Sequence, residues 1–115
     1  MGQTEEHYER GLALKQDGQY DEAEVEFRAI IELDADDAEA HRQLGLVYGF
    51  TGLFDEAIEE LNTAVRLDAA NIGARNDLAL TYCMLGMSDE AKAEFELVLS
   101  VDPDNEVAKK NMIYF

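Results

Sequence analysis

Apolar residues recur at helical spacing along this chain, and the whole pattern repeats with a period of 34 residues. In the first period Ala23, Phe27, Ile30, Ile31 and Leu33 fall within about 160° of arc when placed on a helix. Glutamates occupy most of the remaining arc. The pattern predicts an amphipathic helix that buries one side only, and it returns one and two periods later.

The helix that precedes each of these has two apolar faces. In the second period Leu44 and Tyr48 form one stripe, whereas Leu46 and Phe50 lie at about 200° and 240° from Leu44 around the helix. The same arrangement recurs one period later. If such hairpins stack, the core uses the first stripe, and the second lines up from unit to unit as an apolar row.

Turn-forming residues keep the same register. A glycine stands three residues before each copy of Asp-Glu-Ala, and we expect it to supply the left-handed conformation in which helices commonly end. The aspartate of each copy is expected to begin and cap the second helix of its unit, and an Asp or Asn closing each unit is expected to cap the next helix. The glycines are Gly18, Gly52 and Gly86, the aspartates Asp21, Asp55 and Asp89, and the closing residues Asp37, Asn71 and Asn105.

This register divides the 115 residues into units 4–37, 38–71 and 72–105 and a partial unit 106–115. A period of this length with helical spacing inside it is typical of stacked helical hairpins. We therefore expect one domain over residues 1–115, built from two helices per unit and about seven helices in all.

The net charge limits the classes of partner that this chain is expected to bind. The chain has 26 acidic and 9 basic residues, a net charge of -17, so we expect neither nucleic acid nor an anionic membrane surface as a ligand. Two interpretations of the acidity stay open: steering of a partner with basic flanks, or solubility and adaptation to high salt. One cysteine, no apolar stretch of about 18 residues and no leader-like start predict a cytoplasmic protein without a membrane span.

Together these residues resemble the tetratricopeptide repeat family over essentially the whole chain. The matching positions are Leu44-Gly45, Leu78-Ala79, Tyr48, Tyr82, the three glycines, the alanines Ala23, Ala57 and Ala91, and Asp102-Pro103. The resemblance implies an all-α, right-handed superhelical solenoid whose first helices line a concave groove. It also implies a protein-binding scaffold that holds a peptide or partner helix and catalyses nothing.

The sequence departs from the family at two informative places. His7, His41 and Arg75 stand where the family usually has Trp, and we expect them to pack there. Some members grip the acidic tails of heat-shock chaperones with Lys, Arg and Asn side chains on their first helices. The matching positions here are Tyr8, Leu12, Gln43, Gly73 and Asp77, so we do not expect this chain to bind such tails.

The apolar row of the first helices is the candidate peptide-binding groove, and an apolar peptide or amphipathic helix fits it best. We assign to it Tyr8, Leu12, Arg42, Leu46, Phe50, Asn76, Leu80, Cys83 and Met84. The alternative is that neighbouring first helices pack on one another and bury much of this row.

Chemistry beyond binding is not expected. Equivalent residues such as His7 and His41 lie about a helix-packing distance of 8–10 Å apart, too far to share a zinc ion, and Cys83 has no partner at ligand spacing. The Asp-Glu pairs recur at helix starts, which capping explains and catalysis does not. We therefore expect no metal, no cofactor and no enzymatic activity.

The last ten residues begin a seventh helix that could cover the end of the third unit. They finish on the apolar residues Met112, Ile113, Tyr114 and Phe115. This end could be a short cap, part of a longer chain, or a surface for self-association. The last possibility is the alternative function: a structural scaffold that forms a homo-oligomer through these four residues.

Overall fold

The 34-residue period folds into a row of helical hairpins. The structure, a computed structural model, describes residues 2–115. Seven helices and no strand occur in this range, which confirms the all-α prediction. They are α1 (Gln3–Gln16), α2 (Tyr20–Leu33), α3 (Ala38–Phe50), α4 (Phe54–Leu67), α5 (Ile72–Met84), α6 (Ser88–Val101) and α7 (Glu106–Met112).

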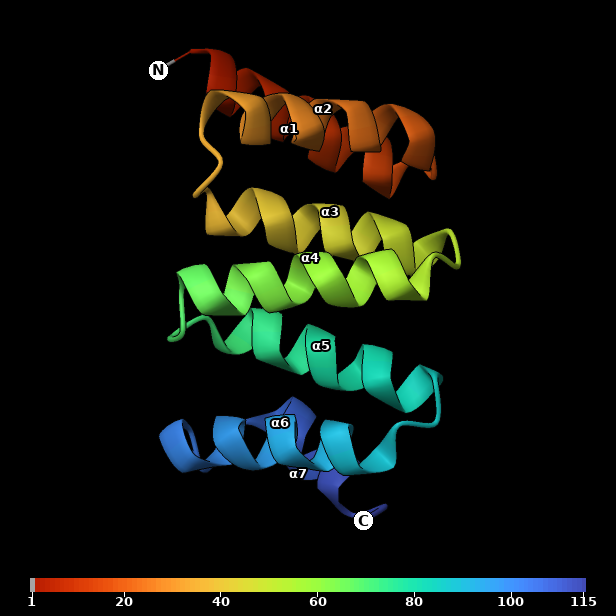
Figure 1. Ribbon diagram of the computed structural model, residues 1–115, viewed down its shortest axis with the longest axis vertical. Coiled ribbons are helices and arrows are strands. Elements are labelled where there is room, and N and C mark those ends of the chain that lie inside the picture. Colours follow the sequence, from red (N-terminus) through yellow and green to blue (C-terminus); the bar gives the residue numbers. More distant parts are fainter. Residues whose placement is uncertain (1) are drawn as a thin grey trace.

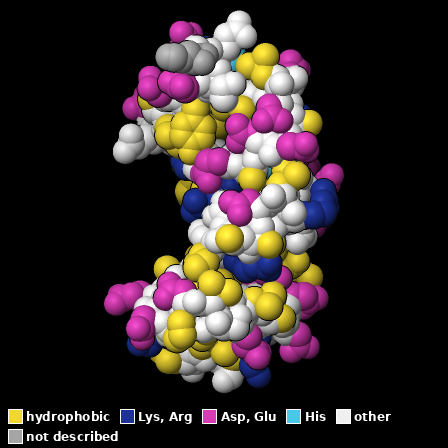
Figure 2. All heavy atoms as spheres, turned by 90° about the vertical axis from the view of Figure 1, so that its left-hand side faces the viewer, with side chains coloured by type: hydrophobic (Ala, Val, Ile, Leu, Met, Phe, Trp, Pro, Cys, Tyr) yellow, Lys and Arg dark blue, Asp and Glu magenta, His cyan; other side chains and the backbone are white. Residues whose placement is uncertain are grey.

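Successive helices run antiparallel and stack along one axis, so that the molecule measures 42 × 26 × 20 Å (Figure 1). Helices α1 and α2, α3 and α4, and α5 and α6 pair as hairpins, while α2 packs on α3 and α4 on α5 between them. In the view of Figure 2, one outline of the stack is hollowed at mid-height. The arrangement is a helical-repeat superhelix in which each unit contacts only its neighbours.

The predicted one-sided stripe of α2 is buried where it meets its neighbours. Ala23, Phe27 and Ile30 are fully buried, and the later units bury their counterparts of Ala23 and Phe27 in the same way. Ile31 is half-buried against this core. Leu33 was wrongly placed in the stripe: it is exposed, because it is the last residue of α2 and the chain leaves the helix in an extended conformation at Asp34.

The turns inside the hairpins follow the prediction for glycine. Gly18, Gly52 and Gly86 have φ values of 79°, 81° and 74°. This left-handed region is one that residues with a Cβ rarely adopt. Because each glycine lies two residues beyond the end of α1, α3 or α5, it reverses the chain into the next helix.

The two sets of predicted caps behave differently. Asp37, Asn71 and Asn105 each accept a hydrogen bond of 3.0 Å from a backbone amide three residues later, so these caps are confirmed. The caps assigned to the Asp-Glu-Ala aspartates are wrong. Helices α2, α4 and α6 begin one residue before the aspartate, and their cap positions are Gln19, Leu53 and Met87, which make no side-chain cap bond.

The cap prediction failed because the turn brings the chain into the helix earlier than the charge pattern suggests. The carbonyls of Gln19, Leu53 and Met87 already accept the first helical hydrogen bonds, at 2.9 to 3.0 Å. The aspartates and glutamates then lie in the first turn, where they interact favourably with the helix dipole.

Candidate functional site

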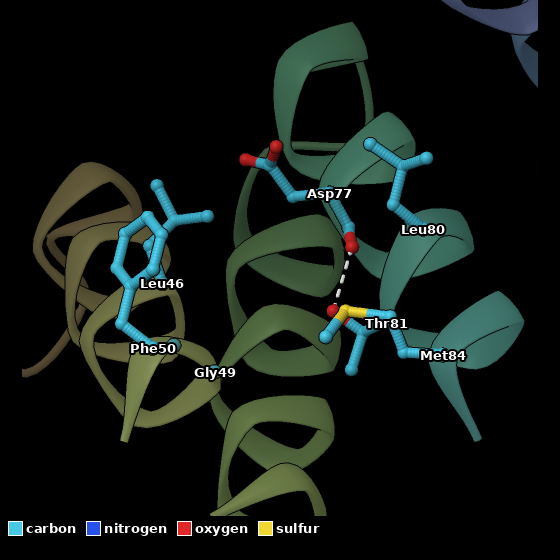
Figure 3. A pocket seen from close by; sticks show the side chains of 8 residues that line it. Leu46, Gly49, Phe50, Asp77, Leu80, Thr81 and Met84 are labelled. Atoms are coloured by element: carbon cyan, nitrogen blue, oxygen red, sulfur yellow. Dashed lines mark hydrogen bonds between the residues drawn. The ribbon is translucent and has the colours of Figure 1, made fainter. Parts of the chain in front are cut away.

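An apolar pocket lies between α3 and α5 (Figure 3). Leu46 and Phe50 project into it from α3, and Leu80 and Met84 from α5. Phe50 is 61% exposed, Leu80 36% and Met84 66%, so a visiting side chain can reach them. The volume is about 220 Å³, and the other lining residues are Gly45, Gly49, Asp77 and Thr81. The alternative, in which neighbouring first helices bury this row, does not hold at these positions.

One charged group lines this pocket. Asp77, one turn before Leu80 on α5, accepts a hydrogen bond from Arg42 on α3, with 2.7 Å between Arg42 Nε and Asp77 Oδ2. Gly73 makes room for this contact, since a Cβ there would lie 2.8 Å from an Arg42 guanidinium nitrogen. The guanidinium therefore lies against the first turn of α5 and joins the second unit to the third.

Further polar contacts extend this pair across the groove to α1. Arg42 Nη1 lies 3.6 Å from a carboxylate oxygen of Glu39, and the Glu39 carboxylate also accepts from Tyr8 at 3.2 Å and from Gln43 at 2.8 Å. Gln43 in turn accepts from Lys15 at 2.6 Å. Both basic side chains of this network are thus engaged by residues of the protein itself.

Burial sets the electrostatics of the network. It raises the pKa of the Asp77 carboxyl above its ordinary value, although the hydrogen bond from Arg42 acts in the opposite direction. Burial and the neighbouring Arg42 charge lower the pKa of the Lys15 ammonium. For each group the charged form costs more than in water, so the partners present compensate it only in part.

A second, acidic pocket lies beside the N-terminal turns of α1 and α3. Its volume is about 340 Å³. It is lined by Thr4, Glu5, Tyr8, Glu9, Asp37 and Glu39. Since Glu39 lines this pocket and Asp77 lines the apolar one, the network through Arg42 connects the acidic pocket to the apolar pocket.

The remaining predicted groove residues lie outside the apolar pocket. Leu12 and Tyr8 are half-buried against the core, where the Tyr8 ring packs edge to face on Phe27 with 6.2 Å between centroids. Cys83 is exposed but lines no described pocket, and burial raises the pKa of its thiol.

Asn76 was wrongly assigned to the groove, because it is buried between α5 and α7. Its Nδ2 donates to the side-chain oxygen of Asn105, 3.1 Å away, and that same oxygen caps α7. Asn76 therefore helps to attach the last helix to the stack.

Asp77, which lines the pocket, and Tyr20, which contacts the pocket residue Phe50, were not singled out from the sequence as binding residues. Asp77 was considered only as a position of the chaperone-tail clamp, and Tyr20 was not considered at all. The Tyr20 ring stacks on Phe50, with 5.3 Å between centroids and 17° between planes. Helical periodicity within α3 could not have found this contact, since Tyr20 is the first residue of α2.

The positions where the family usually has Trp form a repeated polar contact within each unit. His7 lies 2.8 Å from Glu26, His41 2.7 Å from Glu60, and Arg75 3.0 Å from Glu94. No cluster of His, Cys, Asp and Glu able to hold a metal ion occurs within residues 2–115. In the same range no helix is long and apolar enough to span a membrane.

Only part of the predicted self-association surface is available. Met112 packs against the core of the third unit, and the Phe115 ring lies 6.4 Å from that of Phe95. Ile113 and Tyr114 are 75% and 78% exposed. The four-residue surface is therefore corrected to Ile113, Tyr114 and the part of Phe115 that stays exposed, because Met112 is taken up by the core of the third unit.

The sequence matches two family models, one described as "Tetratricopeptide repeat" over residues 51–110 and one described as "TPR repeat" over residues 11–52. No curated protein matches the sequence.

Solved structures share the whole fold. The second TPR domain of the human RPAP3 protein, in complex with the HSP70 peptide SGPTIEEVD, is 26% identical with a TM-score of 0.87, and the match covers 94% of this chain and 90% of that one. The first TPR of Spaghetti (RPAP3), bound to the HSP90 peptide SRMEEVD, is 23% identical with a TM-score of 0.92, over 97% and 89% of the two chains. MamA is 26% identical with a TM-score of 0.85, over 91% of this chain and 61% of that one.

Proposed function

The chain belongs to the tetratricopeptide repeat family, and we propose that it is a non-catalytic interaction module that binds an apolar peptide or an amphipathic helix in its concave groove. Within it we assign three repeats to residues 4–37, 38–71 and 72–105, and a capping helix to 106–115. Solved relatives of this fold hold peptides, as the RPAP3 domains do, which supports an interaction role.

The observation that carries the proposal is the apolar pocket between α3 and α5. Phe50 on α3 and Leu80 and Met84 on α5 expose apolar surface around one pocket that the chain itself leaves uncovered. Side chains of this kind are normally buried, and a contiguous apolar surface in a hollow is typical of a binding site. A leucine-sized or methionine-sized side chain of a partner would bury it.

Chaperone tails such as SRMEEVD are poor ligands for this groove by the same reasoning. Binding of an acidic tail needs free cations in the groove. Arg42 is already paired with Asp77, and Lys15 with Gln43, while position 73 is a glycine. Where the clamp of other members carries cations, the peptide would therefore meet Tyr8, Gly73 and the carboxylate of Asp77.

A charge placed in the pocket tests the proposal. The probe is a nine-residue fluorescein-labelled peptide of sequence Gly-Ser-Leu-Gln-Met-Gln-Leu-Gly-Ser, and its affinity is measured by fluorescence anisotropy. We expect the double variant Leu80→Glu, Met84→Glu to lose at least tenfold in affinity, because a bound apolar side chain would have to desolvate a carboxylate. The peptide SRMEEVD is expected to bind neither protein.

The matched control places the same two charges on other exposed apolar positions, as Val25→Glu with Leu97→Glu. It should bind the probe like the unaltered protein, and circular dichroism should show equal helicity for all three. Equal affinity of the pocket variant and the control would refute the groove assignment.

The second candidate function is a scaffold that self-associates through its C-terminal end. The observation in its favour is the exposure of Ile113 and Tyr114 beyond the end of α7. This surface is small, and its test is given at the scale of the whole molecule below.

A further inference from the structure

We propose that Asp77 makes the groove selective for a peptide that carries a basic side chain next to its apolar anchor. This inference rests on the function proposed above and names the chemistry of the partner. It concerns an interaction segment with Lys or Arg beside Leu, Met or a similar residue.

The geometry places one carboxylate beside one apolar pocket. Asp77 lies one helical turn before Leu80 and Thr81, and all three line the same pocket. Consecutive residues of an extended peptide are about 3.3 Å apart and their side chains alternate in direction, but the long, flexible side chain of a neighbouring Lys or Arg can turn back to the pocket wall. A basic neighbour could therefore meet the Asp77 carboxylate while the anchor fills the pocket.

The charge of Asp77 is still available to such a group. Its side chain is 17% exposed, its ion-pair partner Arg42 also lies close to Glu39, and Lys15 has only a smaller influence on it. The pKa of Asp77 stays raised by burial in spite of Arg42, so the carboxylate gains from a further positive charge.

The surroundings favour the same partner. The acidic pocket continues the groove with Glu5, Glu9, Asp37 and Glu39, and the whole chain has a net charge of -17. Complementary charge speeds association with a basic partner and excludes acidic ones. The apolar pocket alone would not distinguish basic from acidic partners, so the Asp77 carboxylate that lines it would set this selectivity.

The competing explanation is that the Arg42–Asp77 pair only holds the second and third units together. The two explanations differ in the direction in which each variant is expected to change ligand affinity. Loss of either partner breaks the same contact, so a purely structural pair predicts that both losses change ligand binding in the same direction. Selection by Asp77 predicts opposite directions, since loss of Asp77 removes the attracting charge and loss of Arg42 removes its competitor.

The experiment uses three labelled peptides that differ only in charge. The neutral probe described above is compared with a basic probe, in which Lys and Arg replace the two Gln, and an acidic probe, in which two Glu replace them. We expect the full chain to bind the basic probe at least tenfold tighter than the neutral one in about 0.15 M salt, and the acidic probe not at all.

Two variants then separate selection from structure. Asp77→Asn should lower the affinity for the basic probe about tenfold and leave the affinity for the neutral probe unchanged. Arg42→Gln should raise the affinity for the basic probe by about threefold or more. The control Asp104→Asn removes the same charge from an exposed position in the turn before α7 and should change neither affinity by more than about twofold. Thermal melts by circular dichroism check that each variant is folded.

Each remaining result overturns the inference. If all three probes bind the full chain equally, or if both variants shift the basic probe in one direction, Asp77 does not select a cation, although the groove still binds peptides. If Arg42→Gln does not fold, the ratio of basic to neutral affinity in Asp77→Asn decides, and an unchanged ratio refutes the inference. If no probe binds at about 1 mM, the proposed function fails as well.

Discussion

At the scale of single residues, a polar contact is formed at the three equivalent positions where the family usually has Trp and where the sequence predicted a packing role. His7, His41 and Arg75 each meet a glutamate of the next helix, 19 residues on. These glutamates are a further 34-residue repeat that is visible in the sequence, but spacing alone does not say which side chains they meet. Each contact joins the two helices of one hairpin.

In the first hairpin this contact makes stability depend on pH. The hydrogen bond from His7, with a smaller contribution from Arg10, lowers the pKa of Glu26. A depressed folded-state pKa contributes stability above the unfolded pKa of about 4.3, and the contribution is lost as the pH falls through the folded value. We expect Glu26→Gln to cost about 1 kcal/mol at pH 7, and the cost to shrink below about pH 4.3.

Chemical denaturation at a series of pH values measures the change in the free energy of unfolding that Glu26→Gln causes. The exposed Glu32→Gln in the same helix is the control and should be near neutral throughout. A difference between Glu26→Gln and the unaltered protein that stays constant down to pH 3 would show that the Glu26 charge is not involved.

At the scale of elements, the sharp turns inside the hairpins decide how each pair of helices closes. In the second unit the amide of Leu53 donates to the carbonyl of Tyr48 at 2.9 Å, across the left-handed residue Gly52. Closely similar bonds close the other two hairpins. The turn therefore needs a residue that adopts positive φ without strain.

Two glycines close together in the chain should respond to alanine in opposite ways. Gly52→Ala should destabilise the protein by about 1 kcal/mol, because φ is 81° there. Gly49 lies inside α3 with open space around its Cα, so Gly49→Ala should stabilise by about 0.5–1 kcal/mol. Urea unfolding of both variants measures the free energies, and equal signs would contradict the assignment of strain to the turn.

At the scale of the whole molecule, one short helix, α7, closes the C-terminal end of the stack. The core of the third unit is covered by α7, with Ala108 fully buried and Met112 packed against it. Just beyond that helix, Ile113 and Tyr114 are largely exposed and Phe115 is 41% exposed. A stable interface needs about 800 Å² from each partner, more than these three side chains supply.

We therefore expect sedimentation equilibrium to give the monomer mass of 12.9 kDa up to about 100 μM protein. A mass that rises with concentration, and that returns to the monomer value in Ile113→Ser with Tyr114→Ser, would instead support the self-associating scaffold. Val25→Ser with Val101→Ser, at two other exposed positions, is the matched control.

Much of this protein was determined by the sequence alone, because its architecture depends on local and repeated interactions. Helical periodicity, the glycine turns and the caps at Asp37, Asn71 and Asn105 act over a few residues, so their pattern predicts the hairpins and their order. The apolar row could be found for the same reason: Leu46, Phe50, Leu80 and Met84 lie on faces that helix geometry assigns.

Only the tertiary structure decided how these faces meet. Asn76 has the same register as the groove residue Arg42, yet it is buried, because its short side chain lies against the Asn105 cap of α7, whereas the longer Arg42 side chain reaches across to Asp77 on α5 and stays partly exposed. Asp77 becomes part of the site through an arginine 35 residues away that packs over Gly73. Contacts between units depend on the distance and angle of separate helices, and the period of one helix carries no information about either.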